Sequence, residues 1–297
     1  MTLETLWYPT LGTGNSELLR PACCQNEVQF SSSFYSGIGW QAMQDRRFGT
    51  RQTVILAAGN GSRLSATRGN LPKPLVRVAG QTLIEHALDQ AVAAGVDEAI
   101  IVTGNAADQM RAHLETVDTP LKLTVVYNPH YHDPNGVSLL CAEPYVSGAF
   151  YLQMADHVFA HPVLHFLDAI DSAPSICARL LVDFHPVNLD EDDATKVRVA
   201  GRHITAIGKD IYPYDAVDAG CFRLDPRVFD ALHEVSRSEP PSVTLGMRRL
   251  LGRGEFAAVP LTGVRWTDVD TPEDCAKAEL LLSAQRRRNS TREAAVA

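Results

Sequence analysis

Short apolar runs alternate along this chain with segments of helical period. Apolar residues dominate 53–58 (TVILAA), 98–103 (EAIIVT) and 121–127 (LKLTVVY). Such runs are typical of strands that are buried on both faces of a sheet. Between the first two, a helix is predicted over 82–94, where apolar residues recur at 83, 84, 87, 88, 91 and 92 before Gly95.

The alternation continues beyond the third run. A helix is predicted over 106–117, and 138–144 could form another. The run 149–154 (AFYLQM) predicts a further buried strand, which leads into Ala155, Asp156 and His157. Strands that alternate with helices favour a Rossmann-like α/β fold, with a mostly parallel sheet between two layers of helices.

The pattern of apolar and polar residues changes after residue 175. Strands are predicted over 176–183, 196–207 with a turn at 200–201, and 217–224, followed by short helices over 227–235 and 244–251. This half indicates a mixed, partly antiparallel extension of the sheet. A last helix is predicted over 271–282, because Thr271 can cap it and Pro272 suits its first position.

The chain divides into three parts by composition. Residues 1–51 contain scattered aromatic residues without a helical or strand period, which indicates an accessory arm rather than a free linker. That arm could pack on its own body or on a neighbouring subunit, so a homodimer is one alternative. Residues 52–285 are expected to form one α/β domain, and 286–297 are expected to be a frayed tail.

Composition excludes several classes of protein. The 297 residues carry a formal net charge of -8, which argues against a broad basic surface for nucleic acid. The six cysteines include no C-x-x-C pair and are expected to be reduced thiols. No apolar run reaches the roughly 20 residues of a membrane helix, and no signal peptide is evident. We therefore expect a cytoplasmic protein without membrane insertion.

A glycine loop follows the first buried strand, at 56–64 (LAAGNGSRL). The dinucleotide pattern G-x-G-x-x-G fails, because Leu64 stands at its third glycine. A phosphate-binding G-x-x-x-x-G-K-[ST] motif fails as well, because Lys73 follows Pro72 and the pair Gly208–Lys209 precedes an aspartate. The loop and the cations Arg63 and Lys73 could instead hold a triphosphate, since glycine lets backbone N–H groups approach phosphates.

Carboxylates suited to a divalent ion occur in two places. Asp156 stands at the carboxyl end of a predicted strand, where open α/β sheets bind ligands. Asp268 and Asp270 lie just before the last helix. Mg²⁺ prefers such oxygen ligands. Asp268 is the preferred partner of Asp156, because Asp270 could simply help to cap the helix.

The motif L-A-A-G-x-G-x-R-L followed by P-K-P-L resembles the nucleotidyltransferases that activate phosphorylated sugars and alcohols. Further segments occur in the order typical of cytidylyltransferases for inositol 1-phosphate and, less closely, for phosphocholine and phosphonates. These segments are 135–140 (NGVSLL), 154–159 (MADHVF), 193–197 (DATKV), 207–211 (IGKDI), 215–222 (DAVDAGCF) and 268–274 (DVDTPED). The likeness covers residues 52–282.

The resemblance implies a nucleotidyltransferase fold and a Mg²⁺-dependent reaction. CTP and a phosphorylated alcohol would give a CDP-alcohol and pyrophosphate. The residues implied at the nucleotide are Leu56, Ala57, Ala58, Gly59, Gly61, Ser62, Arg63, Lys73, Gly104, Asn135, Gly136 and Ser138. The implied catalytic residues are Arg63, Lys73, Asp156 and Lys209. The implied acceptor residues are Lys209, Asp218 and Trp266, and the implied metal ligands are Asp156, Asp268 and Asp270.

Several alternatives stay open at this point. The base could be guanine or another, and the acceptor a cyclitol phosphate, a sugar 1-phosphate or a phosphonate. A nucleotide sensor without catalysis is a further alternative, which the set of cations and carboxylates disfavours. His157 is interpreted as a positioning or packing residue, because an ionised acceptor phosphate needs no general base. Relatives of the inositol type often carry a membrane-bound phosphotransferase domain downstream, so we expect another protein to perform any second step.

Overall fold

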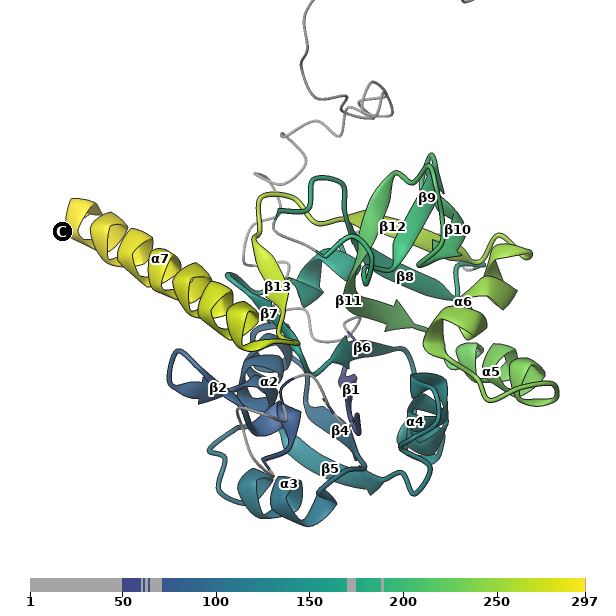
Figure 1. Cartoon of the computed structure of the whole chain (residues 1–297), viewed down its shortest axis with the longest axis horizontal. Coiled ribbons are helices and arrows are strands. Elements are labelled where there is room, and N and C mark those ends of the chain that lie inside the picture. The colour runs from purple at the N-terminus through teal and green to yellow at the C-terminus, as the bar shows by residue number, and fades with distance from the viewer. Residues whose placement is uncertain are drawn as a thin grey trace, which may run out of the picture.

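The first apolar run forms an internal strand of the sheet, between two parallel neighbours. This computed structural model describes residues 50–59, 61, 64, 71–169, 175–187 and 190–296, with side chains to 284 (Figure 1). All six residues of β1 (Gln52–Ala57) are buried. It pairs in parallel with β4 (Glu98–Thr103) on one side and with β6 (Phe150–Met154) on the other. β5 (Lys122–Tyr127) extends the parallel half beyond β4.

The second half of the sheet is mixed. β11 (Ala216–Leu224) runs antiparallel to β6 and to β8 (Ala178–Asp183), and β12 (Phe256–Pro260) pairs in parallel with β8. The hairpin of β9 (Lys196–Ala200) and β10 (His203–Gly208) completes it. Within the described residues the nine strands lie in the order β5-β4-β1-β6-β11-β8-β12-β10-β9, and β9 also pairs with β11. The expected α/β fold with a partly antiparallel extension is confirmed.

Helices cover both faces of this sheet (Figure 1). α4 (Asn135–Ala142), α5 (Val228–Ser236) and α6 (Val243–Leu251) share one apolar cluster with Val54 and Leu56 of β1. α2 (Leu83–Ala93) and α3 (Ala107–Leu114) share the other with Ile55 and Ala57. Alternate β1 residues therefore face opposite layers, which explains why the whole run is apolar.

Two small ribbons flank the sheet. β7 (His157–Phe159) pairs with β13 (Trp266–Asp268), and β2 (Arg77–Val78) pairs with β3 (Gln81–Thr82). Short 3-10 helices occur at Lys73–Leu75 (η4), Glu143–Tyr145 (η5) and Leu164–Leu167 (η6). The β7–β13 ribbon places the residues that precede the last helix close to the end of β6.

The last helix, α7, is longer than the sequence pattern predicts. It runs from Pro272 to Val296. The prediction of a frayed tail from residue 286 is therefore wrong for residues 286–296. The amino-terminal half of α7 packs on a third apolar cluster that includes Val78, Val158 and Ala278. Beyond that cluster the sequence is rich in good helix formers such as Arg, Gln, Glu and Ala, which favour the continuation of the helix.

Two further features concern the chain as a whole. Residues 1–49 of the arm that is expected over 1–51 lie outside the described residues. In the part of the chain that the structure describes, no helix is both long and apolar enough to span a bilayer.

Candidate active site

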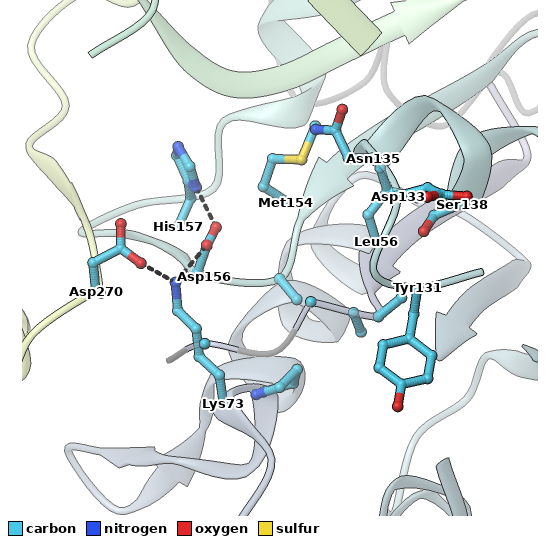
Figure 2. Close-up of a pocket in the computed structure, with 16 residues that line it drawn as sticks. Leu56, Lys73, Tyr131, Asp133, Asn135, Ser138, Met154, Asp156, His157 and Asp270 are labelled. Atoms are coloured by element: carbon cyan, nitrogen blue, oxygen red, sulfur yellow. Dashed lines mark hydrogen bonds and ion pairs between the residues drawn. The ribbon is translucent and has the colours of Figure 1, made fainter. Parts of the chain in front are cut away.

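A pocket of about 430 Å³ opens at the carboxyl ends of β1 and β6 (Figure 2). Several segments that are far apart in sequence contribute to its wall. The lining residues are Leu56, Ala57, Ala58, Gly59, Gly61, Lys73, Pro74, Tyr131, Asp133, Asn135, Ser138, Met154, Ala155, Asp156, His157 and Asp270. This is the edge at which open α/β sheets bind ligands.

The glycine loop forms one wall of the pocket. Ala58, Gly59 and Gly61 follow β1 directly, and Gly61 has a φ of 52°, a left-handed conformation that glycine adopts without strain. A Cβ added at Gly59 would meet no described atom within 4 Å, so the backbone there faces open space. Ser62 and Arg63 lie outside the described residues, and their predicted contacts with the nucleotide stay predictions.

Lys73 is the cation at the centre of the site. It begins η4, and its side chain is almost completely buried. Its Nζ lies 2.7 Å from Oδ2 of Asp156 and 2.5 Å from Oδ1 of Asp270 (Figure 2). Burial by itself would lower the pKa of Lys73, but the two carboxylates outweigh burial and raise it. The ammonium therefore stays charged at neutral pH.

Asp156 is held from two sides. Its Oδ2 accepts from Lys73, and its Oδ1 lies 2.8 Å from Nδ1 of His157. Burial would raise the pKa of Asp156, but Lys73 and His157 lower it well below its usual range. The backbone oxygen of Asp156 accepts from Val269 N at 2.9 Å, which joins the end of β6 to the segment before α7.

Asp270 rather than Asp268 meets Lys73 in this structure. The cap of α7 is formed by Thr271 and Asp274, whose Oδ2 accepts from Thr271 N at 3.0 Å, so the Asp270 carboxylate is not needed there. Asp268 lies opposite His157 in the β7–β13 ribbon and is not among the residues that line the pocket. Burial raises the pKa of Asp268, and the carboxylates of Asp270 and Asp156 raise it further.

The site concentrates negative charge in a way that suits a divalent cation. Asp156, Asp268 and Asp270 interact electrostatically, and the raised pKa of Asp268 reflects their mutual repulsion as well as burial. Among the described residues, no group of three or more His, Cys, Asp or Glu side chains is arranged to hold a metal by itself. Mg²⁺ usually takes one or two carboxylates and completes its coordination with water and substrate phosphates, so these residues fit it.

The opposite end of the pocket is lined by the segment before and within α4. Sequence reasoning missed Tyr131 and Asp133, which carry no motif of their own. A Cβ at Gly104 would lie 2.3 Å from Cβ of Tyr131, so Gly104 lets the Tyr131 loop approach the end of β4. Gly104 itself is not among the described lining residues.

Two predicted nucleotide residues also hold α4 against α6. A Cβ at Gly136 would lie 2.6 Å from the carbonyl oxygen of Pro241, which makes glycine necessary for this contact. Asn135 lines the pocket, and its Oδ1 accepts from Val243 N at 2.9 Å, at the start of α6. Both residues thus have packing roles, and their contacts with a nucleotide stay predictions.

Two of the predicted acceptor residues, Asp218 and Trp266, lie beside His157 without lining the pocket. The Trp266 indole stacks on the His157 ring at 5.4 Å between centroids, and its Nε1 donates to Oδ2 of Asp183 at 2.9 Å. Burial raises the pKa of Asp218 to about 6, although its Oδ1 accepts from Gly220 N at 2.7 Å.

Lys209 has a different environment. It follows β10 and pairs with Asp193, and its side chain is about half exposed. Its backbone oxygen accepts from Nζ of Lys196 at 2.8 Å. The structure therefore brings Asp218 and Trp266 beside His157, whereas Lys209 is engaged with the segment before β9.

Residues 53–199 match the family model of the MobA-like NTP transferase domain. The match covers the glycine loop, Lys73, Asp156 and the parallel half of the sheet. Together with the relatives described next, it shows that the chain belongs to the nucleotidyltransferase superfamily, whose fold it has.

Within that superfamily, the chain is similar to the bifunctional IPC transferase and DIPP synthase of Rubrobacter xylanophilus, with 35% identity over 251 residues, 80% of this chain and 54% of the relative. It is similar to the solved inositol-1-phosphate CTP transferase from T. maritima, with 27% identity, a TM-score of 0.71, and coverage of 80% of this chain and 97% of that one. A shorter likeness, 32% over 128 residues, is to the CMP-5'-(3-aminopropyl)phosphonate synthase of Streptomyces rubellomurinus, covering 43% of this chain and 20% of that protein. The chain spans about half the length of the first of these relatives.

Proposed function

We propose that this chain is a cytidylyltransferase that transfers CMP from CTP to the phosphate of an alcohol such as inositol 1-phosphate and releases pyrophosphate. One observation carries the proposal. The Lys73 ammonium lies between the Asp156 and Asp270 carboxylates beside the glycine loop, in a chain similar to an inositol-1-phosphate CTP transferase. That grouping provides both a cation for phosphates and carboxylates for a divalent ion.

The reaction joins two anions. An oxygen of the acceptor phosphate attacks the α-phosphorus of CTP, a new P–O bond forms, and the bond to the β-phosphate breaks to release pyrophosphate. Catalysis consists mainly of holding the reactants in line and stabilising the charge that develops. Lys73 supplies a fixed positive charge at the triphosphate, and the backbone at Gly59 and Gly61 supplies N–H donors. No general base is required, because the acceptor phosphate is already ionised.

A magnesium ion fits the carboxylate side of the pocket. We propose that Asp156 and one or both of Asp268 and Asp270 would hold it. When bound, the ion would neutralise triphosphate charge that Lys73 alone leaves uncompensated. The chain's own contribution is orientation, because His157 and Lys73 each fix one oxygen of Asp156.

The acceptor is proposed to bind on the His157 side of the pocket. Asp218 would contact acceptor hydroxyls, and Trp266 would form a wall. Lys209 would meet the acceptor phosphate after exchanging its ion pair with Asp193, an exchange that its half-exposed position allows.

A pyrophosphate-release screen tests the proposed reaction. Each of the four NTPs is combined with inositol 1-phosphate, phosphocholine, aminoethylphosphonate, sugar 1-phosphates and cyclitol phosphates, with and without Mg²⁺. We expect release with CTP and inositol 1-phosphate that requires Mg²⁺. Release with another NTP and none with CTP would overturn the assignment of the base, and activity undiminished by a chelator would overturn the role of the ion.

A phosphonate acceptor is the second candidate. It is favoured by the similarity to the CMP-5'-(3-aminopropyl)phosphonate synthase, which covers 43% of this chain. The same screen separates the two candidates, because they share CTP and differ only in the acceptor.

A further inference from the structure

A buried tryptophan supports the ring that holds Asp156. The Trp266 indole lies in β13 and is only 9% exposed. It stacks on the His157 ring at 5.4 Å between centroids and on the Phe159 ring at 6.1 Å. Nδ1 of His157 lies 2.8 Å from Oδ1 of Asp156 (Figure 2). The indole is therefore one contact removed from that carboxylate.

The indole is itself held by a carboxylate from the main sheet. Nε1 of Trp266 donates to Oδ2 of Asp183 at 2.9 Å. Asp183 is the last residue of β8, and β8 and β13 belong to different sheets. Its other oxygen, Oδ1, accepts from His185 N at 2.9 Å. Asp183 is not among the described residues that line the pocket, and no sequence motif marks it.

These contacts form a continuous chain from the end of β8 to the end of β6. An indole N–H can only donate, so where it is buried it needs an acceptor. Asp183 supplies that acceptor while the indole lies within 8° of parallel to the His157 ring. Without it the N–H must turn toward another acceptor or toward water, and the plane of the indole turns with it. The His157 ring then loses the surface on which it stacks.

The position of the His157 ring is set at three places. Its edge lies against the backbone of Gly220, where an added Cβ would come within 2.5 Å of Cδ2 and Nε2. Its face lies against Trp266, and its Nδ1 bonds to Asp156. Of these three supports, the indole depends in turn on Asp183. The orientation of the Asp156 carboxylate is thus linked to a side chain outside the pocket.

We propose that Asp183 is a positioning residue for the Asp156 carboxylate. It acts through two rings, the indole of Trp266 and the imidazole of His157. This role rests on the proposed function, because Asp156 is there one of the groups that hold the divalent ion at the triphosphate. Catalysis by orientation is sensitive to small displacements, and a misplacement of about 1 Å can cost about 10²-fold in rate.

Two substitutions of Asp183 separate its acceptor from its bulk. Asp183→Leu removes the acceptor and keeps a side chain of similar size. We expect kcat for pyrophosphate release to fall about tenfold, the value of one ordinary hydrogen bond, with little change in the KM for CTP. Asp183→Asn keeps one acceptor oxygen. The buried indole N–H takes that oxygen, since the exposed His185 N can bond to water, so kcat should return most of the way to the wild-type value.

Asp225→Leu is the matched control. Asp225 follows β11 beside the start of β6, at the opposite edge of the sheet from the pocket. Its Oδ1 accepts from Arg227 N at 3.1 Å, a bond to the residue two positions on like the one that Asp183 makes. Asp225→Leu therefore loses a comparable turn contact and should leave kcat unchanged. Thermal unfolding of each variant reports any general loss of structure.

A double-variant cycle distinguishes positioning from a general structural role. In the His157→Ala background, Asp183→Leu should have no further effect on kcat, because the ring through which it acts is gone. A purely structural role would reduce kcat by the same factor in both backgrounds, and that result would overturn the inference. A wild-type kcat in Asp183→Leu would overturn it as well.

Proton NMR of the His157 ring tests the chain of contacts without turnover. A ring N–H that donates to a carboxylate resonates downfield, and its loss in His157→Ala assigns the signal. We expect this resonance in the wild type and in Asp183→Asn, and its loss or broadening in Asp183→Leu. If that pattern is seen but the wild type releases no pyrophosphate, the proposed function fails while the link from Asp183 to Asp156 is supported. An unchanged resonance in Asp183→Leu, with an active wild type, overturns the inference alone.

Discussion

Replacing Gly220 with alanine would test how the protein holds the Asp156 carboxylate. Gly220 has a φ of 72°, and a Cβ added there would lie 2.5 Å from both Cδ2 and Nε2 of His157. The His157 ring stacks on Trp266 within 8° of parallel, so the two aromatic rings are packed one against the other. The ring therefore cannot yield to the methyl group without losing its stacking or its bond to Asp156.

The expected cost has two parts. A left-handed conformation costs a non-glycine residue about 1 kcal/mol, and overpacking a fixed side chain adds about 1–3 kcal/mol. Gly201→Ala is a matched control, because Gly201 has a φ of 60° but a Cβ there meets no described atom within 4 Å. We expect Gly220→Ala to lower the free energy of unfolding by about 2 kcal/mol more than Gly201→Ala does.

Denaturant unfolding and pyrophosphate release are measured on the same preparations. Gly220→Ala should reduce kcat, because displacement of His157 releases one oxygen of Asp156, whereas Gly201→Ala should leave kcat unchanged. In the double variant with His157→Ala the steric cost should disappear, so that the two losses of stability are strongly non-additive. Equal destabilisation by the two glycine variants, or simple additivity in the double variant, would refute the reasoning.

Three other predictions follow from the same site. Lys73→Met should reduce turnover by about 10²-fold or more, because a charge that stabilises the reacting phosphates is lost. The control Lys122→Met, which removes the exposed lysine of an ion pair with Glu98, should leave turnover unchanged. Equal effects of the two variants in an initial-rate assay would exclude a special role for Lys73. Asp156→Asn should abolish most turnover while circular dichroism stays native, and near-wild-type pyrophosphate release would contradict the assignment. Burial raises the folded-state pKa of Asp218 to about 6, so its ionisation reduces stability as pH rises from about 4 through 6. Asp218→Asn should therefore be more stable than wild type at neutral pH and lose that advantage in acid, and a pH-independent difference in unfolding free energy would refute this.

Local patterns in the sequence were enough for the core of the fold. β1, β4 and β6 are almost continuous apolar runs, because helices cover both faces of these strands, whereas the edge strand β5 is only partly buried. The glycine loop after β1 could also be predicted locally. A turn that leaves a buried strand needs small residues whose φ is little restricted. The ribbons β2–β3 and β7–β13 were missed, because strands of two or three residues are too short to establish a period.

The partners within the site depend on contacts that no local pattern records. Lys73 and Asp270 are 197 positions apart, and whether Asp268 or Asp270 meets the lysine depends on how the β7–β13 ribbon and α7 pack on the sheet. The sequence allows Asp270 to help cap α7, but in the structure Thr271 and Asp274 form that cap and the Asp270 carboxylate binds Lys73.

The sequence by itself determined the class of fold, because that depends on short runs of apolar residues and glycines. The class of enzyme and most of the residues that line the pocket followed from the resemblance of its motifs to those of nucleotidyltransferases. Only the tertiary structure decided which side chains touch. The bond from the Trp266 indole to Asp183 is an example, since 83 positions separate the two residues along the chain. Hydrogen bonds and ion pairs act over a few ångströms, so their partners are set by packing and not by distance along the chain.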